Sequence, residues 1–437
     1  MYRKIEAYLK TYFENDEGKI LIIDGARQIG KTYIITKIGK EKYKNFISIN
    51  FDEDNKGHQI FKDVTNIDDF YIQLTAAYGN KLNNREDTLI FLDEISIYPQ
   101  YFSLLKQLSI DNKYRYICSG SLLDVELNKS GLSPMGYVTI KKMYPMDFEE
   151  FLLANGFGKE AIDKVYKSFN KKESLQEGLH NILINHFFSY LYVGGLPDCV
   201  KTYVEEKNVM KIKDIQKDIY SFYENDASKY DKENQLKIKR IYGMLLSCID
   251  NKVKRIKFNE VDNNKRDTYS KYHEEFDYLI NSGIALDCNA VSEPKFPLVQ
   301  STTKNLIKLY MNDVGLLSYL LYRNNINAIL KQKTGVNLGA VYETVVAQEL
   351  KAHGHDLYYY DRRKVGEVDF LVNDYNDLTV LPLEIKSGKE GYEYKAMPKL
   401  LKTEGYRINA GYVLSNDREV TIKDGIVHMP IYYILFI

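Results

Sequence analysis

With 437 residues, 44% of them hydrophobic and 27% charged, the chain has a globular composition and the length for two or three domains. Its 60 Lys and Arg residues balance 60 Asp and Glu residues, so net charge favours neither a nucleic-acid nor a membrane partner. The four cysteines form no CxxC pair, which argues against a disulfide framework and a zinc site. No apolar run approaches the about 20 residues that a membrane helix needs, which argues against a membrane span. Together these features predict a cytoplasmic protein.

Short apolar runs alternate with helical stretches over residues 1–145, the pattern of a parallel α/β sheet. The expected strands are Ile20–Asp24, Phe46–Asn50, Thr88–Leu92, Tyr114–Cys118 and Tyr137–Ile140. Helices are expected at Lys31–Lys40 and Asp69–Tyr78. This part of the chain is therefore predicted to be one α/β domain.

A phosphate-binding pattern, GxxxxGK[ST], follows the first expected strand. Its residues are Gly25, Ala26, Arg27, Gln28, Ile29, Gly30, Lys31 and Thr32. The strand–loop–helix order is the context that this motif requires, because glycines let backbone N–H groups face phosphate oxygens at a helix N-terminus. We expect Lys31 to reach the β- and γ-phosphates of ATP and the Thr32 hydroxyl to ligate Mg²⁺.

Two acids, Asp93 and Glu94, end the third expected strand. At that position Asp93 is expected to hold Mg²⁺ through water, and Glu94 to polarise the attacking water. The next strand ends at Ser119, which we expect to contact the γ-phosphate or that water. Either motif alone could be a glycine-rich turn or a capping acid pair without a nucleotide, but both in this order favour an ATP site.

The middle of the chain is predicted to be mostly helical. Helices are expected from about Pro145 to Ser228, with a turn at Gly194–Pro197. Three helices and then strands at Ile284–Ala290 and Leu306–Tyr310 would suit a winged helix.

Basic residues are concentrated near the start of this helical and stranded segment. Seven Lys or Arg residues and one acid, Asp250, lie between Lys237 and Lys257. These cations could contact DNA phosphates, but they could equally lie on a solvated helix face or dock a protein.

The last hundred residues again combine a helix with strands. The helix is expected at Leu338–His353, and the strands at Leu357–Tyr360, Val368–Val372, Val380–Ile385 and Ala410–Leu414. We expect the final segment, Met429–Ile437, to be a buried strand.

Three residues in these strands form the pattern D…ExK: Asp369, Glu384 and Lys386. Glu384 and Lys386 share a strand face, and a hairpin would bring Asp369 beside them. Asp369 and Glu384 could then bind a metal while Lys386 orients water for phosphodiester attack, with Glu343 as a third acid. The alternatives are a solvated strand face with a salt bridge, or a nuclease-like fold that binds without cutting.

The order of several segments resembles the bacterial and archaeal AAA-type ATPases that carry a C-terminal DUF4143 domain. The segments are GARQIGKT at 25–32, LIFLDE at 89–94, CSGSLL at 118–123, YPMDFEEFL at 144–152, GGLPDCV at 194–200, KLYMNDVGLL at 308–317, and the closing EVDF and LEIKSG. The resemblance implies an AAA-like domain at 1–145, a helical lid or linker at 146–230, a winged-helix-like domain at 231–330 and a PD-(D/E)xK nuclease-like domain at 331–437.

One departure from that family concerns a cation. Such ATPases often carry Arg or Lys after a glycine just before the YPMDFEEFL segment, whereas Gly136 is followed by Tyr137. Arg27, Arg115, or Lys141 with Lys142 would have to compensate.

We therefore predict an α/β protein whose cofactors are ATP and Mg²⁺. Two activities remain open downstream of the ATP site: a nuclease that acts on DNA or RNA, and a non-cleaving nucleotide switch. Its partner would be a nucleic acid, another protein or a second copy of the chain.

Overall fold

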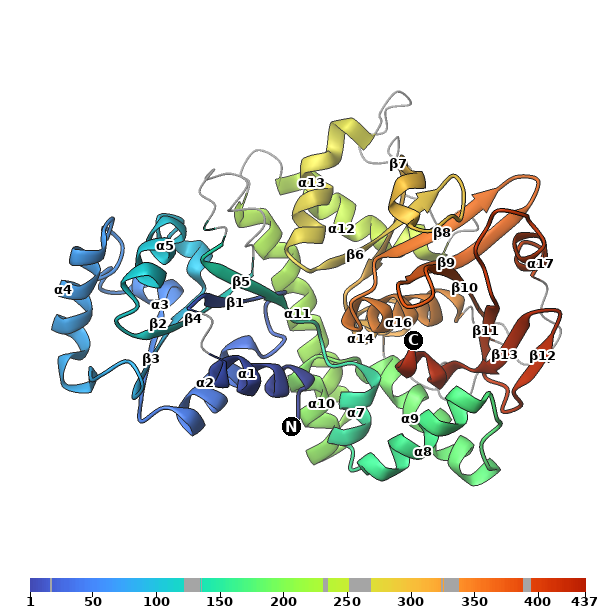
Figure 1. Cartoon of the computed structure of the whole chain (residues 1–437), viewed down its shortest axis with the longest axis horizontal. Coiled ribbons are helices and arrows are strands. Elements are labelled where there is room, and N and C mark those ends of the chain that lie inside the picture. Colours follow the sequence, from blue (N-terminus) through green and yellow to red (C-terminus); the bar gives the residue numbers. More distant parts are fainter. Residues whose placement is uncertain are drawn as a thin grey trace. The chain divides into compact units, whose positions relative to one another are not determined.

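The computed structural model describes residues 1–15, 18–121, 134, 136–230, 235–250, 269–323, 325, 338–387 and 394–437. Two compact units are present (Figure 1): the first holds Met1–Tyr144 with Asn281–Gly283, and the second holds Pro145–Ile280 with Ile284–Ile437. In the part of the chain that is described, no helix is long and apolar enough to cross a membrane.

A five-stranded parallel sheet forms the centre of the first unit (Figure 1, blue to cyan). Its strands are β1 (Ile20–Asp24), β2 (Asn45–Asn50), β3 (Thr88–Asp93), β4 (Arg115–Gly120) and β5 (Val138–Lys142). The order is β2-β3-β4-β1-β5, and every neighbouring pair is parallel. Since β1 lies next to β4, and β4 next to β3, the carboxyl ends of these three strands meet at one edge, where α/β proteins bind ligands.

Helices and 3-10 turns connect these strands. They are α1 (Lys4–Glu14), α2 (Lys31–Lys42), α3 (Phe51–Lys56), α4 (Ile67–Tyr78), η1 (Gly79–Lys81), η2 (Ile95–Ile97) and α5 (Tyr101–Asp111). The N-terminal helix α1 contacts α2, and ion pairs join Glu6 to Lys37 at 2.9 Å and Glu14 to Lys42 at 2.8 Å. The α/β architecture predicted for this region is confirmed, with the expected strands found to within two residues at each end.

The second unit begins with a helical part. Its helices are α7 (Phe148–Ala154), α8 (Lys159–Lys171), α9 (Glu177–Val193), α10 (Pro197–Glu206), α11 (Val209–Tyr230), α12 (Gln235–Asp250) and α13 (Tyr269–Asn281). The turn expected at Gly194–Pro197 separates α9 from α10, with Gly194 at a φ of 74° and a proline opening α10.

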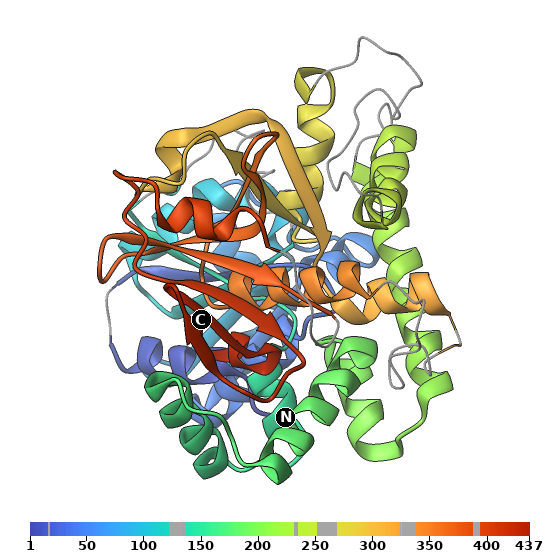
Figure 2. The same cartoon turned by 90° about the vertical axis from the view of Figure 1, so that its right-hand side faces the viewer.

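A mixed sheet of eight strands follows in this unit, in the order β12-β13-β11-β10-β9-β8-β6-β7. The strands are β6 (Ala285–Val291), β7 (Thr302–Met311), β8 (Leu357–Arg362), β9 (Gly366–Asp374), β10 (Thr379–Ile385), β11 (Gly411–Ser415), β12 (Thr421–Lys423) and β13 (Ile426–Pro430). The remaining helical segments are η4 (Leu298–Ser301), α14 (Val314–Tyr322), α16 (Gly339–Ala352), α17 (Met397–Leu401) and η5 (Ile431–Phe436). Helix α16 packs on β6, β7, β8 and β10 (Figures 1 and 2).

Two sequence expectations differ from this architecture. The strands expected as the wing of a winged helix, β6 and β7, are antiparallel to each other, but β6 also pairs with β8, so both belong to the C-terminal sheet. The final segment was expected to be a strand; β13 ends at Pro430, and Ile431–Phe436 forms the buried 3-10 helix η5. Periodicity cannot separate strand from helix in so short an apolar run, so burial was predicted correctly and the conformation was not.

Candidate functional site

The loop between β1 and α2 has the backbone of a phosphate cradle. Gly25, Gln28 and Gly30 have positive φ angles of 150°, 65° and 91°. A side chain at Gly25 would place its Cβ 2.2 Å from the backbone oxygen of Met143, so glycine is required there. Helix α2 begins at Lys31 without a side-chain cap, which leaves its first N–H groups facing the loop.

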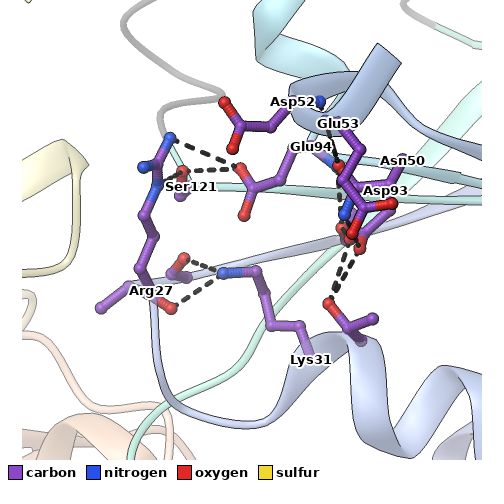
Figure 3. Close-up of polar contacts among 12 residues, drawn as sticks. Arg27, Lys31, Asn50, Asp52, Glu53, Asp93, Glu94 and Ser121 are labelled. Carbon is purple, nitrogen blue, oxygen red and sulfur yellow. Dashed lines mark hydrogen bonds and ion pairs between the residues drawn. The ribbon is translucent and has the colours of Figure 1, made fainter. Parts of the chain in front are cut away.

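Lys31 is buried inside this loop. Its Nζ donates hydrogen bonds of 2.8 Å to the backbone oxygens of Gly25 and of Ala26 (Figure 3). Burial lowers the pKa of the Lys31 ammonium, and the carboxylates of Glu94, Asp24 and Asp93 oppose that shift. The loop's own carbonyl groups thus hold the ammonium inside the loop.

Asp93 and Thr32 meet across the cradle at the carboxyl end of β3. The Thr32 hydroxyl donates to Asp93 Oδ2 at 3.0 Å, and the Ser119 hydroxyl donates to Asp93 Oδ1. Burial raises the pKa of Asp93, and the hydrogen bonds from Ser119 and Thr32 lower it. A hydroxyl and a carboxylate at this spacing are the hard oxygen ligands that Mg²⁺ prefers, so the residues present fit a nucleotide-bound Mg²⁺.

Glu94 lies beside this pair in a left-handed conformation, with a φ of 56°. Its backbone N–H donates to Ser119 Oγ at 3.2 Å. Its Oε2 accepts a 3.0 Å hydrogen bond from Ser121 and lies 3.9 Å from an Arg27 nitrogen (Figure 3). A left-handed non-glycine residue costs of order 1–3 kcal/mol, a strain that is typical of functional sites.

Sequence reasoning missed Asn50, the last residue of β2. Its Nδ2 donates to Asp93 Oδ2 at 3.2 Å, while its Oδ1 accepts from the backbone N–H groups of Asp52 at 3.0 Å and Glu53 at 3.1 Å (Figure 3). Asn50 therefore caps α3 and at the same time orients the Asp93 carboxylate. An asparagine between a strand and an acidic helical turn was the available sequence signal.

Arg3 was also missed, because nothing in the local sequence distinguishes it. Its guanidinium is buried and donates to the backbone oxygen of Ile29 at 2.8 Å and to that of Tyr144 at 2.7 Å. One side chain thus fixes a carbonyl of the phosphate loop and a carbonyl beyond β5.

The cations considered as compensation for the missing basic residue lie in different places. Arg27 is engaged with Glu94 and donates to Ser121 Oγ at 3.1 Å. Arg115 begins β4, so within this chain it lies at the sheet edge opposite the phosphate loop. Lys141 lies over the ring of Tyr8. Of the segment 133–137, which lacks the basic residue, residues 133 and 135 lie outside the described residues.

The C-terminal pattern residues are brought together by a hairpin of β9 and β10, whose register pairs Leu383 with Phe370. The backbone N–H of Ile385 donates to Asp369 Oδ2 at 2.8 Å, and Lys386 Nζ lies 2.7 Å from Glu384 Oε1. Burial raises the pKa of Glu384 to about 8, with Asp369 as the next contributor. Asp369 and Glu384 are each only 7% exposed.

Glu343 lies on α16 and accepts a 3.3 Å hydrogen bond from the Tyr310 hydroxyl on β7. Two residues before Tyr310, Lys308 is 2% exposed, and its Nζ lies 2.5 Å from Glu367 Oε1. Burial alone would lower the pKa of Lys308, but the carboxylates of Glu367, Glu343 and Asp369 raise it above its ordinary value. A lone lysine within the apolar run Leu306–Tyr310 was the only sequence signal for this residue.

Among the described residues, no group of three or more His, Cys, Asp or Glu side chains is arranged to hold a metal ion. The basic segment is seen only in part. Lys237 pairs with Glu275 at 3.6 Å and Lys239 donates to Asn225 at 3.2 Å. Its cations from Lys252 to Lys257 lie outside the described residues, so DNA contact by this segment stays a prediction.

The parallel sheet of the first unit and the loop that leads from β1 into α2 have the fold of a P-loop NTPase. Residues 17–152 match the family model of an AAA domain, and residues 338–434 match that of DUF4143, a domain of unknown function. Residues 184–327 match a further domain of unknown function, DUF8612. The chain thus combines an N-terminal AAA domain with a C-terminal DUF4143 domain, as its motif order predicted.

Solved structures with a similar chain path are distant in sequence. A Walker-type ATPase of Pyrococcus abyssi is 12% identical, with a TM-score of 0.45 over 73% of this chain and 95% of that one. The Orc1 protein of Aeropyrum pernix, solved in complex with DNA, is 12% identical, with a TM-score of 0.32 over 76% of this chain and 95% of that one. The RuvB Holliday junction branch migration motor of Thermotoga maritima is 15% identical, with a TM-score of 0.28 over 64% and 86%. No curated protein matches the sequence.

Proposed function

We propose that this chain binds and hydrolyses ATP with Mg²⁺ in its first unit. The observation that carries this proposal is the contact of Thr32 and Ser119 with Asp93 beside a cradle that encloses the Lys31 ammonium. Hydroxyl, carboxylate and ammonium groups that converge on a helix N-terminus suit a triphosphate and its metal.

Each side chain has a distinct role in this proposal. Lys31 exchanges its two loop carbonyls for β- and γ-phosphate oxygens and neutralises their charge. Thr32 and Asp93 hold Mg²⁺, which when bound neutralises charge that develops on the phosphates. Glu94 accepts a proton from the attacking water, and Ser119 orients both acids through its bonds to Asp93 Oδ1 and the Glu94 N–H.

Replacing Lys31 with alanine tests the ATP site. We expect ATP affinity to fall roughly 30- to 5000-fold, since truncating one partner of a buried charge pair costs about 2–5 kcal/mol. Isothermal titration with ATP and Mg²⁺ measures it, and Lys40→Ala, an exposed lysine on the same helix, is the matched control. An unchanged affinity in Lys31→Ala would remove the assignment.

For the second unit we propose a non-cleaving recognition module whose partner is a nucleic acid or a protein, governed by the nucleotide state. Asp369 and Glu384 cluster as the D…ExK pattern requires, which is the observation that favours a nuclease. Against it, both carboxyl groups are buried and the Lys386 ammonium is hydrogen-bonded to Glu384. A nuclease needs carboxylates open to metal and substrate.

A DNA-cleavage assay separates a nuclease from a non-cleaving module. Plasmid and single-stranded DNA are incubated with the protein and Mg²⁺ or Mn²⁺, with and without ATP. We expect no cleavage by the wild type above that of Lys386→Ala, from protein that still hydrolyses ATP. Cleavage that is lost in Lys386→Ala would instead establish a nuclease, and a dependence on ATP would tie it to the first unit.

A further inference from the structure

Lys308 forms an ion pair with Glu367, one of the C-terminal acids, but it lies outside the domain that contains those acids. It lies on β7, whereas Asp369, Glu384 and Glu343 come from residues 338–434, the DUF4143 match. Its register partner on β6 is Cys288, and its Nζ lies 4.4 Å from the centre of the Tyr359 ring on β8. The side chain thus crosses apolar surface before its ammonium reaches Glu367.

Burial makes this lysine and these acids dependent on each other. An ammonium that is 2% exposed is stable only when carboxylates compensate its lost hydration, and Glu343 at 3% and Asp369 at 7% exposed need cations for the same reason. A second cation, Lys386, is already bonded to Glu384 Oε1. Lys308 is thus paired with Glu367 and Lys386 with Glu384, so two ammonium groups lie among these acids where a nuclease would require a divalent metal.

We infer that the Lys308 ammonium is the built-in counter-ion of this carboxylate cluster, and that it excludes the divalent cation which the D…ExK pattern would otherwise bind. Removing it turns the cluster into a Mg²⁺ or Mn²⁺ site. Glu384 Oε2, which is buried and has no hydrogen-bond partner among the described residues, supplies one ligand, and Asp369 supplies another. This inference rests on the proposal that the second unit does not cleave, but its test measures metal binding.

Lys308→Met tests it, because methionine fills a similar volume beside Cys288 and Tyr359 without the charge. All variants carry Lys31→Ala and are studied without nucleotide, so that the phosphate loop contributes no metal site. Free Mn²⁺ is counted by electron paramagnetic resonance during titration of the full chain. We expect Mn²⁺ to bind Lys308→Met about 100-fold or more tighter than the parent, because a positive charge at close range is gone.

Two further variants test whether the new Mn²⁺ site is formed by this carboxylate cluster. Asp369→Asn added to Lys308→Met should abolish the new site, and Lys295→Met, which removes an exposed lysine paired with Glu293 at 2.7 Å, should bind no Mn²⁺. If Lys308→Met does not fold alone, refolding with Mn²⁺ should restore it. Parent protein that binds Mn²⁺ and loses it with Asp369→Asn would overturn the inference. So would a Lys308→Met protein, folded or refolded with Mn²⁺, that takes up no metal.

The results that would overturn the counter-ion role of Lys308 differ from those that would overturn the proposed function. Mn²⁺ binding by the parent without DNA cleavage would remove the counter-ion role of Lys308 and leave a non-cleaving module. Cleavage that needs Lys386 would remove the non-cleaving proposal itself. Neither result bears on ATP binding, which Lys31→Ala reports in the first unit.

Discussion

Glu94→Gln is expected to lower the turnover number for ATP hydrolysis about 10²–10⁴-fold while ATP affinity stays within about threefold. Glutamine has the same shape and can still accept the hydrogen bond that Ser121 donates to Glu94 Oε2. It cannot accept a proton from water, so the loss falls on chemistry and spares binding. Phosphate release at saturating ATP gives the turnover number, and titration calorimetry gives the affinity.

The matched control for this variant is Glu53→Gln, an exposed acid on α3 near the same sheet edge. It should hydrolyse ATP at the wild-type rate. Glu94→Gln turnover equal to that of Glu53→Gln would show that another group takes the proton. Loss of ATP affinity together with turnover would mean that Glu94 shapes the cradle, where it pairs with Arg27.

The sheet of the first unit was predictable because buried parallel strands appear in sequence as continuous apolar runs. Ile20–Asp24 is buried at every position and was found at its expected bounds. The eight-stranded sheet was predictable only strand by strand. Nothing local to β6 indicates that its second neighbour is β8, about seventy residues later, so the pair was assigned to a separate wing.

The residues of the candidate site also fall into two groups, those that a local motif predicts and those that only the fold brings together. Residues of the phosphate loop and of Asp93-Glu94 could be predicted as candidates because a local motif and a strand end specify them. Arg3 and Lys308 were not, since each acts on groups 26 or more positions away along the chain. The contacts of these buried cations depend on tertiary packing, so the residues next to them in the sequence do not indicate their partners.

Asp313 is fully buried in the second unit. Its Oδ2 accepts from the Gly195 N–H at 2.6 Å, and its Oδ1 accepts from the Leu316 N–H at 3.1 Å and caps α14. Gly194 packs so closely that a Cβ there would lie 2.2 Å from Asp313 Oδ1. One fully buried carboxylate thus joins the α9–α10 turn to the start of α14.

Asp313→Asn is expected to destabilise this unit by about 2–3 kcal/mol. An amide offers one acceptor oxygen for two backbone donors, and its NH₂ group opposes the second N–H. Hydrogen exchange should therefore speed up at Gly195 and Leu316 and stay unchanged in β1 and β3 of the first unit. Asp377→Asn, at an exposed position, is the control and should shift stability by no more than about 0.5 kcal/mol.

The cost of Asp313→Asn should also depend on pH. Burial raises the pKa of Asp313 to about 6, partly offset by backbone N–H groups and by Lys213. The folded pKa exceeds the unfolded one, so the stability that this carboxyl contributes is complete below its ordinary pKa of 3.8 and is lost as pH rises through about 6. Asparagine does not titrate, so the stability difference between wild type and variant should be larger at pH 5 than at pH 7.

Lys213 on α11 and Cys199 on α10 face the same carboxylate, but their charge states are constant over that interval because the pKa of Lys213 is about 8 and burial raises that of Cys199. A difference that does not change between pH 5 and pH 7 would mean that Asp313 is ionised throughout, and that its bonds to Gly195 and Leu316 outweigh the cost of burying its charge.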